Sequence, residues 1–184
     1  GSEMCIRDRD SESELWIGSW EEGLFRVKAD GTIENFKYNA KDTHSLSSNF
    51  VRACCEDNLG NIWIGTFNGL NRYNKITGLF QNHTANDTQA DGLTHSSIWC
   101  IVKDNQGTLW LGTYFGGVNY FNPEYEIYTR YSYSSNEKKG LSNPVVGRTI
   151  EDKDDNLWIG TEGGGLNYYN RRTREFKWYR PQEV

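Results

Sequence analysis

The sequence predicts an all-β protein assembled from about four copies of one repeating unit, and two observations carry this prediction. First, the motif Asn-Ile-Trp-Ile-Gly-Thr at residues 61–66 returns in closely related form at residues 15–19, 109–113 and 157–161, and its tryptophans are separated by 47, 47 and 48 residues. Second, each copy contains several short apolar runs, and no segment shows a sustained helical period. A fixed period of this size is typical of repeat architectures.

Further positions keep the same register in successive copies. An Asp stands six residues before each Trp, and a Leu stands seventeen residues before three of them. Three copies also reach an Asn and then, six residues later, an aromatic residue. In chain order these anchors are Asp10, Asp57, Asp104 and Asp152; Leu46, Leu93 and Leu141; Asn74, Asn122 and Asn170; and Phe80, Tyr128 and Phe176. So many anchors in one register indicate a true structural repeat.

The unit around the second Trp shows how one copy is expected to fold. Its four strands are predicted at residues 51–56, 62–66, 70–74 and 79–83. Asp57 and Gly60 suit the turn after the first strand, because Asp bonds backbone amides two residues on and Gly adopts positive φ. Four short antiparallel strands in 47 residues are typical of a β-propeller blade. The predicted fold is therefore a β-propeller of about four four-stranded antiparallel blades.

Domain boundaries follow from the repeat. Asp8 stands where later copies place Cys55, Val102 and Ile150, so an expected apolar site carries a carboxylate. We therefore interpret residues 1–9 as a non-native or truncated N-terminus, with the first copy beginning at its second strand, around Glu14. The predicted blades are 10–45 (incomplete), 46–92, 93–140 and 141–184 within a propeller region of 10–184.

Composition narrows the function classes. The net charge is −5 with interspersed signs, which does not favour nucleic acid or an anionic membrane surface as partner. No apolar run approaches the roughly 20 residues of a membrane helix, and no signal peptide is visible. Three of the four Cys lie in apolar strand-like runs, two of them adjacent, which indicates small buried residues rather than disulfides or zinc ligands. We expect no metal and no cofactor.

Several short segments of the second copy resemble the two-component regulator propeller repeat. They are Leu-Ser-Ser-Asn and Val-Arg within 46–52, Glu-Asp at 56–57, Gly-Asn-Ile-Trp-Ile-Gly-Thr at 60–66 and Gly-Leu-Asn-Arg-Tyr-Asn at 69–74. The copies at 93–122 and 141–170 match nearly as well, and the resemblance covers about 10–180. It implies seven-bladed propellers, often in tandem, that form the periplasmic sensors of membrane-bound histidine kinases. Such sensors typically detect oligosaccharides and switch on glycan-utilisation genes.

The resemblance also sets expectations for this chain. About four copies of a seven-bladed family imply an open arc or a fragment, with the remaining blades and a membrane-anchored kinase as partners. Any kinase activity would lie outside this segment, which is expected to be non-catalytic and periplasmic. Because exposed strand edges and uncovered blade faces favour association, we expect self-association or marginal stability.

Candidate ligand-binding residues lie where the loops between second and third strands meet the connections between blades. The position four after each Trp reads Trp20, Phe67, Tyr114 and Glu162, and Phe115 adds an aromatic. Flat aromatic faces suit sugar rings. The blade connections add Asn49, Arg52, His95 and Arg148 as ligand-binding candidates, and also His44. Their side chains would bind the hydroxyls, a uronate or a sulfate of the ligand. A competing interpretation is that these residues only pack against neighbouring blades.

Two other function classes stay open beside the oligosaccharide sensor. A propeller lyase or glycosidase would need carboxylates and histidines clustered at the mouth of the central channel. The repeated Asp residues are expected on the opposite rim, as turn formers. A protein-binding scaffold would use the loop aromatics as hot spots. The acidic run at 152–155 and the glycines at 163–165 lack the context of calcium or phosphate loops and are interpreted as turns.

Overall fold

The computed structural model describes residues 6–85 and 92–180 of the chain. Within them, sixteen strands form four separate four-stranded antiparallel sheets. Blade 1 comprises β1 (Ile6–Arg9), β2 (Leu15–Gly18), β3 (Leu24–Val27) and β4 (Ile33–Phe36). Blade 2 comprises β5 (Val51–Glu56), β6 (Ile62–Thr66), β7 (Gly69–Asn74) and β8 (Leu79–His83). Blade 3 comprises β9 (Ile98–Lys103), β10 (Leu109–Thr113), β11 (Val118–Asn122) and β12 (Ile127–Tyr131). Blade 4 comprises β13 (Val146–Glu151), β14 (Leu157–Thr161), β15 (Gly165–Asn170) and β16 (Glu175–Tyr179).

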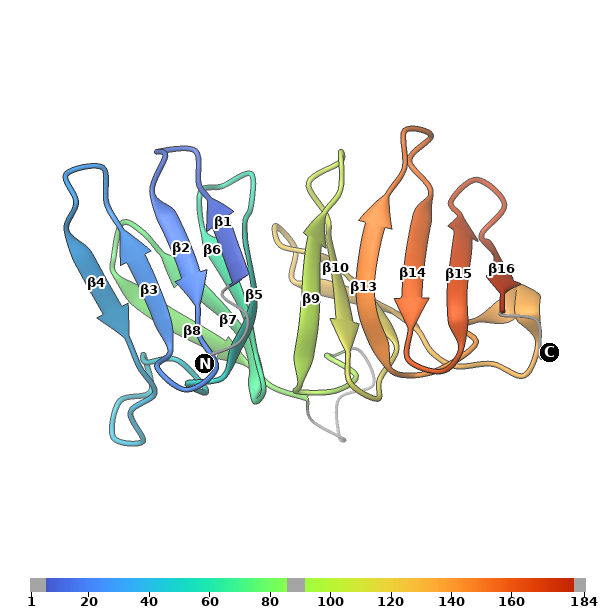
Figure 1. Cartoon of the computed structure of the whole chain (residues 1–184), viewed down its shortest axis with the longest axis horizontal. Helices are drawn as coiled ribbons and strands as arrows, with labels where there is room; N and C mark the ends of the chain where they lie inside the picture. The colour runs from blue at the N-terminus through green and yellow to red at the C-terminus, as the bar shows by residue number, and fades with distance from the viewer. Residues whose placement is uncertain (1–5, 86–91, 181–184) are drawn as a thin grey trace.

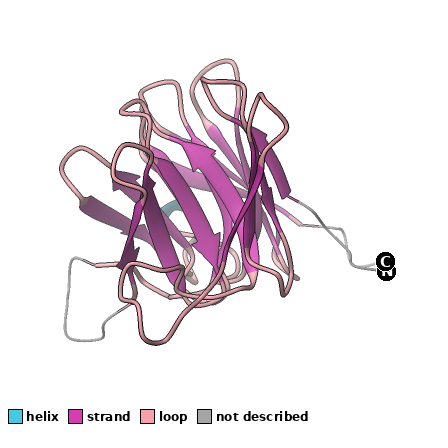
Figure 2. Cartoon of the chain, turned by 90° about the vertical axis from the view of Figure 1, so that its left-hand side faces the viewer, coloured by secondary structure: helices cyan, strands magenta, loops and turns pink. Residues whose placement is uncertain are grey.

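The four sheets stand side by side as an open arc rather than a closed ring (Figure 1). Strands consecutive in sequence pair within each blade, and the first strands of neighbouring blades pack on one another: β1 on β5, β5 on β9, and β9 on β13. Figure 2 shows mainly strands, with loops gathered at the two ends of the sheets and one short helical turn, η1 (Glu137–Lys139). The predicted all-β propeller architecture is confirmed. Within residues 6–85 and 92–180, the structure contains no helix with the length and hydrophobicity of a membrane-spanning segment.

The first blade differs from the sequence-based expectation. Residues Ile6–Arg9 form a strand in the repeat register, with Asp8 opposite Trp16 as Cys55 is opposite Trp63. The prediction that this blade begins near Glu14 is therefore wrong for residues 6–9, while residues 1–5 lie outside the described part. The physical reason is that strand pairing uses backbone groups, and the Asp8 side chain is only half-buried. Its burial raises the pKa of the Asp8 carboxyl.

The repeated tryptophans lie between blades. Trp16, Trp63 and Trp110 are exposed by only 1%, 0% and 1%, because each is covered by the blade that follows. Each of the three apolar clusters of the core combines residues of two consecutive blades. Trp158 is half-buried, since no described blade covers the outer face of blade 4. Three of the four repeated tryptophans are thus core residues, and the fourth is only partly buried.

A buried asparagine joins the third strand of a blade to the connection that enters it. Asn71 is fully buried, and its Oδ1 accepts a hydrogen bond from the Ser47 N–H at 2.8 Å. Asn119 and Asn167 repeat this bond with Thr94 and Ser142 at 3.1 and 2.8 Å. Because buried polar groups must be paired, these bonds hold the blade connections against the loops between second and third strands. Both sets of loops therefore share one rim, where the candidate residues lie.

Candidate functional site

The first strands of blades 2, 3 and 4 carry the same irregularity at their starts. In β5, Val51 pairs with Thr66 and Ala53 with Gly65, which leaves Arg52 between them without a partner residue. The corresponding unpaired residues of β9 and β13 are Trp99 and Gly147. Bulges of this kind redirect a side chain and are common beside binding sites. Here the bulges lie at the starts of the strands through which neighbouring blades pack on one another, next to the blade connections.

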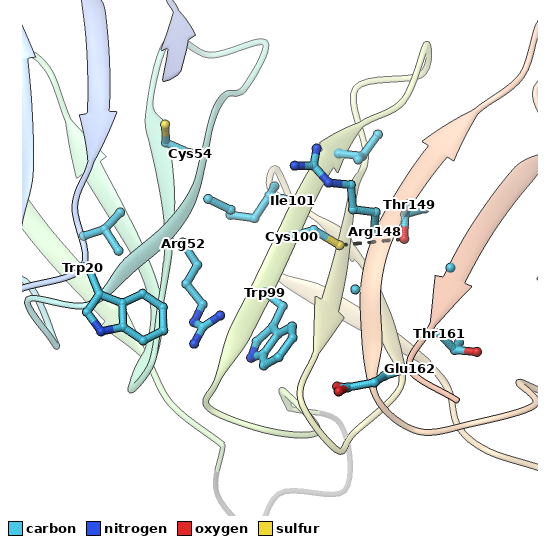
Figure 3. Close-up of a pocket in the computed structure, with 15 residues that line it drawn as sticks. Trp20, Arg52, Cys54, Trp99, Cys100, Ile101, Arg148, Thr149, Thr161 and Glu162 are labelled. Atoms are coloured by element: carbon cyan, nitrogen blue, oxygen red, sulfur yellow. Dashed lines mark hydrogen bonds between the residues drawn. The ribbon is translucent and has the colours of Figure 1, made fainter. Parts of the chain in front are cut away.

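Arg52 lies between two tryptophan rings from different blades. Its guanidinium carbon lies 4.5 Å from the ring centroid of Trp20 and 4.4 Å from that of Trp99. Trp20 follows the second strand of blade 1, and Trp99 belongs to the first strand of blade 3, so three blades meet at one cation (Figure 3). Attraction between a cation and two aromatic rings favours this arrangement.

Further aromatic rings extend this cluster in both directions. Tyr114 stacks on Trp99 at a centroid distance of 5.0 Å and contacts Phe115 at 4.5 Å, with His95 6.4 Å from Tyr114. On the other side, Phe50 lies 5.8 Å from Trp20 and 6.3 Å from Phe67. We call this set the aromatic rim: Phe67, Phe50, Trp20, Arg52, Trp99, Tyr114, Phe115 and His95.

The aromatic rim is accessible to a ligand. Its ring members at either end, Phe67 and Phe115, are exposed by 56% and 57%, and Trp20 is exposed by 44%. Packing against neighbouring blades, the competing interpretation of these residues, therefore accounts for only part of their surface. A large apolar surface left in water on several neighbouring rings is typical of an interaction site.

A groove of about 760 Å³ adjoins the rim, whose Trp20, Arg52 and Trp99 contribute to its lining. Its walls come from β5, β9 and β13, together with Trp20 and Glu162 from loops after second strands. Its charged lining residues are Arg52, Arg148 and Glu162. This volume lies within the range of small-molecule sites, and mostly apolar walls with a few polar groups are the usual composition of such sites.

Arg52 has no counter-charge. It makes no hydrogen bond or ion pair with any residue in the described ranges 6–85 and 92–180, and its Nε is buried without a partner. Burial lowers the pKa of the Arg52 guanidinium from its ordinary value, although it stays charged at neutral pH. The indole Nε1 of Trp99 is likewise buried without a partner. Two donors at the groove are thus unused by the described residues.

The thiols near the groove do not provide a nucleophile. Burial raises the pKa of Cys54 to about 12, and burial also raises the pKa of Cys100. Both thiols are therefore protonated at neutral pH, and only a thiolate is strongly nucleophilic. Among the described residues that line the groove, Glu162 is the one carboxylate and no His is present. This arrangement does not supply a paired general acid and base.

The structure brings most sequence candidates together and separates two of them. Trp20, Arg52, Arg148 and Glu162 line the groove, and Phe67, Tyr114, Phe115 and His95 lie along the rim. Asn49 instead holds a loop, because its Oδ1 accepts the Tyr38 N–H at 2.7 Å. His44 lies away from the groove, with Nδ1 3.3 Å from the Phe80 carbonyl.

Sequence reasoning missed Trp99 and Phe50. A signal for Trp99 existed, since it stands 47 residues after Arg52 and so occupies the same position of the repeat. Phe50 precedes the first strand of blade 2, and its carbonyl accepts the Phe67 N–H at 3.0 Å. That bond places the two rings next to each other, a contact that the sequence alone does not reveal.

Known proteins resemble this chain in sequence pattern and in fold. Residues 45–68, 92–115 and 140–163 match the family model described as two component regulator propeller. The extracellular domain assigned to the hybrid two component system BT4673 of B. thetaiotaomicron shares 27% identity at a TM-score of 0.77, over 94% of this chain and 24% of that one. The corresponding domain of BT3049 shares 22% identity at a TM-score of 0.74, over 91% of this chain and 22% of that one.

An enzyme shares the fold as well. Virginiamycin B lyase from Staphylococcus aureus superimposes with a TM-score of 0.71 at 14% identity, over 100% of this chain and 57% of the lyase. Identity this low shows a common fold alone. No curated protein matches the chain in sequence. The chain spans about a quarter of the length of these two extracellular domains.

Proposed function

We propose that the chain is a ligand-sensing part of the extracytoplasmic domain of a two-component sensor histidine kinase, since residues 45–68, 92–115 and 140–163 match the two component regulator propeller model. In this proposal the chain itself performs no chemistry, and the remaining blades and the membrane-anchored kinase belong to the rest of the protein. The likeness to extracellular domains of hybrid two component systems supports an extracytoplasmic, periplasmic location.

The ligand proposed for this sensor is an oligosaccharide, and the aromatic rim is the observation that carries the proposal. Sugar rings present apolar C–H faces between hydroxyl groups, which suits exposed aromatic faces next to polar donors. Trp20, Tyr114 and Phe115 supply such faces beside a groove that also contains Arg148 and Glu162. A chain of a few sugar units could contact the rim and the groove together.

Signalling would use the fact that the site is shared between blades. Trp20, Arg52 and Trp99 come from blades 1, 2 and 3, so a ligand that contacts all three favours one relative placement of these blades. A ligand shifts a conformational equilibrium only through such differential contacts. In the proposed sensor, this shift reaches the kinase and leads to transcription of glycan-utilisation genes.

A protein-binding scaffold is the second candidate, favoured by the exposure of the aromatic rim. Neighbouring exposed aromatics are typical of protein interfaces as well as of sugar sites. A carbohydrate-active lyase or glycosidase has less support, because its argument is a shared propeller fold at 14% identity.

Thermal unfolding against a panel of neutral, uronic and sulfated oligosaccharides tests the proposal. A ligand present at about 100 times its Kd should stabilise the fold by about 2.7 kcal/mol. Trp20→Ala and Tyr114→Ala should abolish the shift, whereas Tyr125→Ala, which removes an exposed ring in the turn after β11, should preserve it. Recovery of a cleaved sugar would overturn the sensor in favour of an enzyme. A shift unaffected by both rim variants would overturn the role of the rim.

A further inference from the structure

Arg52 differs from the other partly buried arginines of the structure. Arg26 pairs with Glu14 at 2.6 Å, and Arg171 pairs with Asp104 at 2.7 Å. Arg52 is half-buried between two tryptophan rings, yet no carboxylate of the described residues forms an ion pair with it. Because an unpaired charge away from water is costly, a partly buried cation without a partner marks a place where a ligand can supply the counter-charge.

The net charge of the groove also favours an anionic ligand. Its lining contains two arginines and one glutamate, so its net charge is positive, whereas the whole chain carries −5. Neither Arg148 nor Glu162 forms a side-chain ion pair within the described residues, so both charges are free to face a ligand. A positive groove in a negative protein concentrates anions at that groove.

We propose that the Arg52 guanidinium is a subsite for the carboxylate of a uronic acid, so that the ligand of this groove is an acidic oligosaccharide. This inference rests on the proposed oligosaccharide sensor and names its ligand class. The planar fork of an Arg matches the two oxygens of a carboxylate. Since Nε is enclosed, the terminal nitrogens Nη1 and Nη2 make the contact. The rings of Trp20 and Trp99 hold the fork in place before the ligand arrives.

The position of Glu162 gives the ligand a direction. Figure 3 shows Trp99 between Arg52 and Glu162, with Glu162 on the side of blade 4. A carboxylate repels a second carboxylate and accepts hydrogen bonds from hydroxyls. The acidic group of the ligand therefore lies at Arg52, and its neutral hydroxyl-bearing rings extend along the groove toward Glu162.

Calorimetric titration with a trisaccharide of galacturonic acid and with its methyl ester tests the subsite, because the ester keeps the sugar rings and hydroxyls but replaces each carboxylate charge by a neutral methyl ester. The wild type should bind the acid at least about tenfold more tightly than the ester. Arg52→Gln should remove this preference and keep the ester affinity. Arg52→Lys, which keeps the charge without the fork, should show an intermediate preference. Arg172→Gln, an exposed arginine in the turn after β15, serves as matched control and should behave as wild type.

A salt titration of the wild type tests the same subsite without any variant, so it remains informative if Arg52→Gln fails to fold. Raising the salt from about 0.05 to about 0.5 M should weaken binding of the acid and leave the ester unchanged. Equal affinities for acid and ester in the wild type, or a preference that persists in Arg52→Gln, would overturn the subsite. An Arg52-dependent preference for a sulfated trisaccharide that contains no uronic acid would overturn the carboxylate assignment in favour of sulfate. If no saccharide binds at all, the proposed sensor function itself fails.

Discussion

The indole Nε1 of Trp63 donates a hydrogen bond to Oδ2 of Asp57 across 2.7 Å, and the other oxygen of the same carboxylate closes the turn before the strand. Oδ1 of Asp57 accepts the backbone N–H groups of Leu59 and Asn61, both at 2.9 Å. The same Asp-to-Trp bond recurs in the other three blades at 2.9, 2.9 and 3.1 Å. One carboxylate per blade thus orients both a turn and the core tryptophan.

Replacement of this carboxylate should destabilise the protein without affecting ligand specificity. Asp57→Ala leaves Trp63 Nε1 and two backbone N–H groups without their acceptor, which should lower the free energy of unfolding by about 2–4 kcal/mol. Urea denaturation measures this change. Asp154→Ala, in the equivalent turn of blade 4, is the control and should change stability by less than about 0.5 kcal/mol. A selective loss of saccharide binding by a stable Asp57→Ala variant would contradict a purely structural role.

A glycine stands two residues after each repeated tryptophan, and its lack of a side chain allows the first strand of the next blade to pack closely against it. A Cβ on Gly65 would lie 2.7 Å from Cγ2 of Ile98 in blade 3, whereas a Cβ on Gly160 would meet nothing nearer than the Arg148 carbonyl at 3.7 Å. Gly65→Ala should therefore cost about 1–3 kcal/mol of unfolding free energy, and Gly160→Ala less than about 0.5 kcal/mol. Equal losses in the two variants would show that blade contact does not explain the repeated glycine.

Acid should weaken the contact between blades 1 and 2. Lys75 of blade 2 lies 3.3 Å from Asp10 and 2.9 Å from Glu56. Burial alone would raise the pKa of Asp10, but hydrogen bonds from Trp16 and Glu14 and the charge of Lys75 outweigh it and hold that pKa below its ordinary value. The pKa of Glu56 is also lowered: hydrogen bonds from Lys75 and Ser11 outweigh burial.

Because these pKa values are depressed in the folded state, their stabilising contribution is complete above the ordinary values near 4 and is lost as pH falls through the lowered ones. At pH 7, Lys75→Met should lower the unfolding free energy by about 1–3 kcal/mol. That difference from wild type should shrink between about pH 5 and about pH 2 in urea titrations. A difference independent of pH would show that Lys75 acts through packing alone.

The outer face of blade 4 should make the chain self-associate. Trp158 is half-buried where its counterpart Trp110 is covered by the next blade, and Ile150 is exposed by 62% beside it. An apolar sheet face in water favours association. Sedimentation velocity should show mass that rises with concentration, and Ile150→Glu should shift the chain toward monomer. Ile76→Glu, in an exposed turn, should not. A wild type that stays monomeric at all concentrations would refute this prediction.

The repeat by itself determined most of the fold. Strand boundaries, the Asp turns and three buried tryptophans follow from signals a few residues long, namely apolar runs, turn residues and fixed spacings. Such signals act within one blade, where hydrogen bonds and side-chain alternation are local. The same reasoning failed at residues 6–9, because it treated Asp8 as evidence against a strand that the backbone ladder forms without an apolar side chain.

The candidate site was only half visible in the sequence. Trp20, Arg52 and Glu162 could be predicted as candidate residues from the sequence, but their assembly in one groove could not. The contribution of Trp99 to the site was not predicted either, although it lies 47 residues from Arg52 and its ring contacts the Arg52 guanidinium. Such contacts depend on how successive blades are rotated against each other, a relation that no local pattern encodes. The sequence alone therefore determined the blades and their cores, whereas only the tertiary structure decided which side chains from different blades share one unpaired cation.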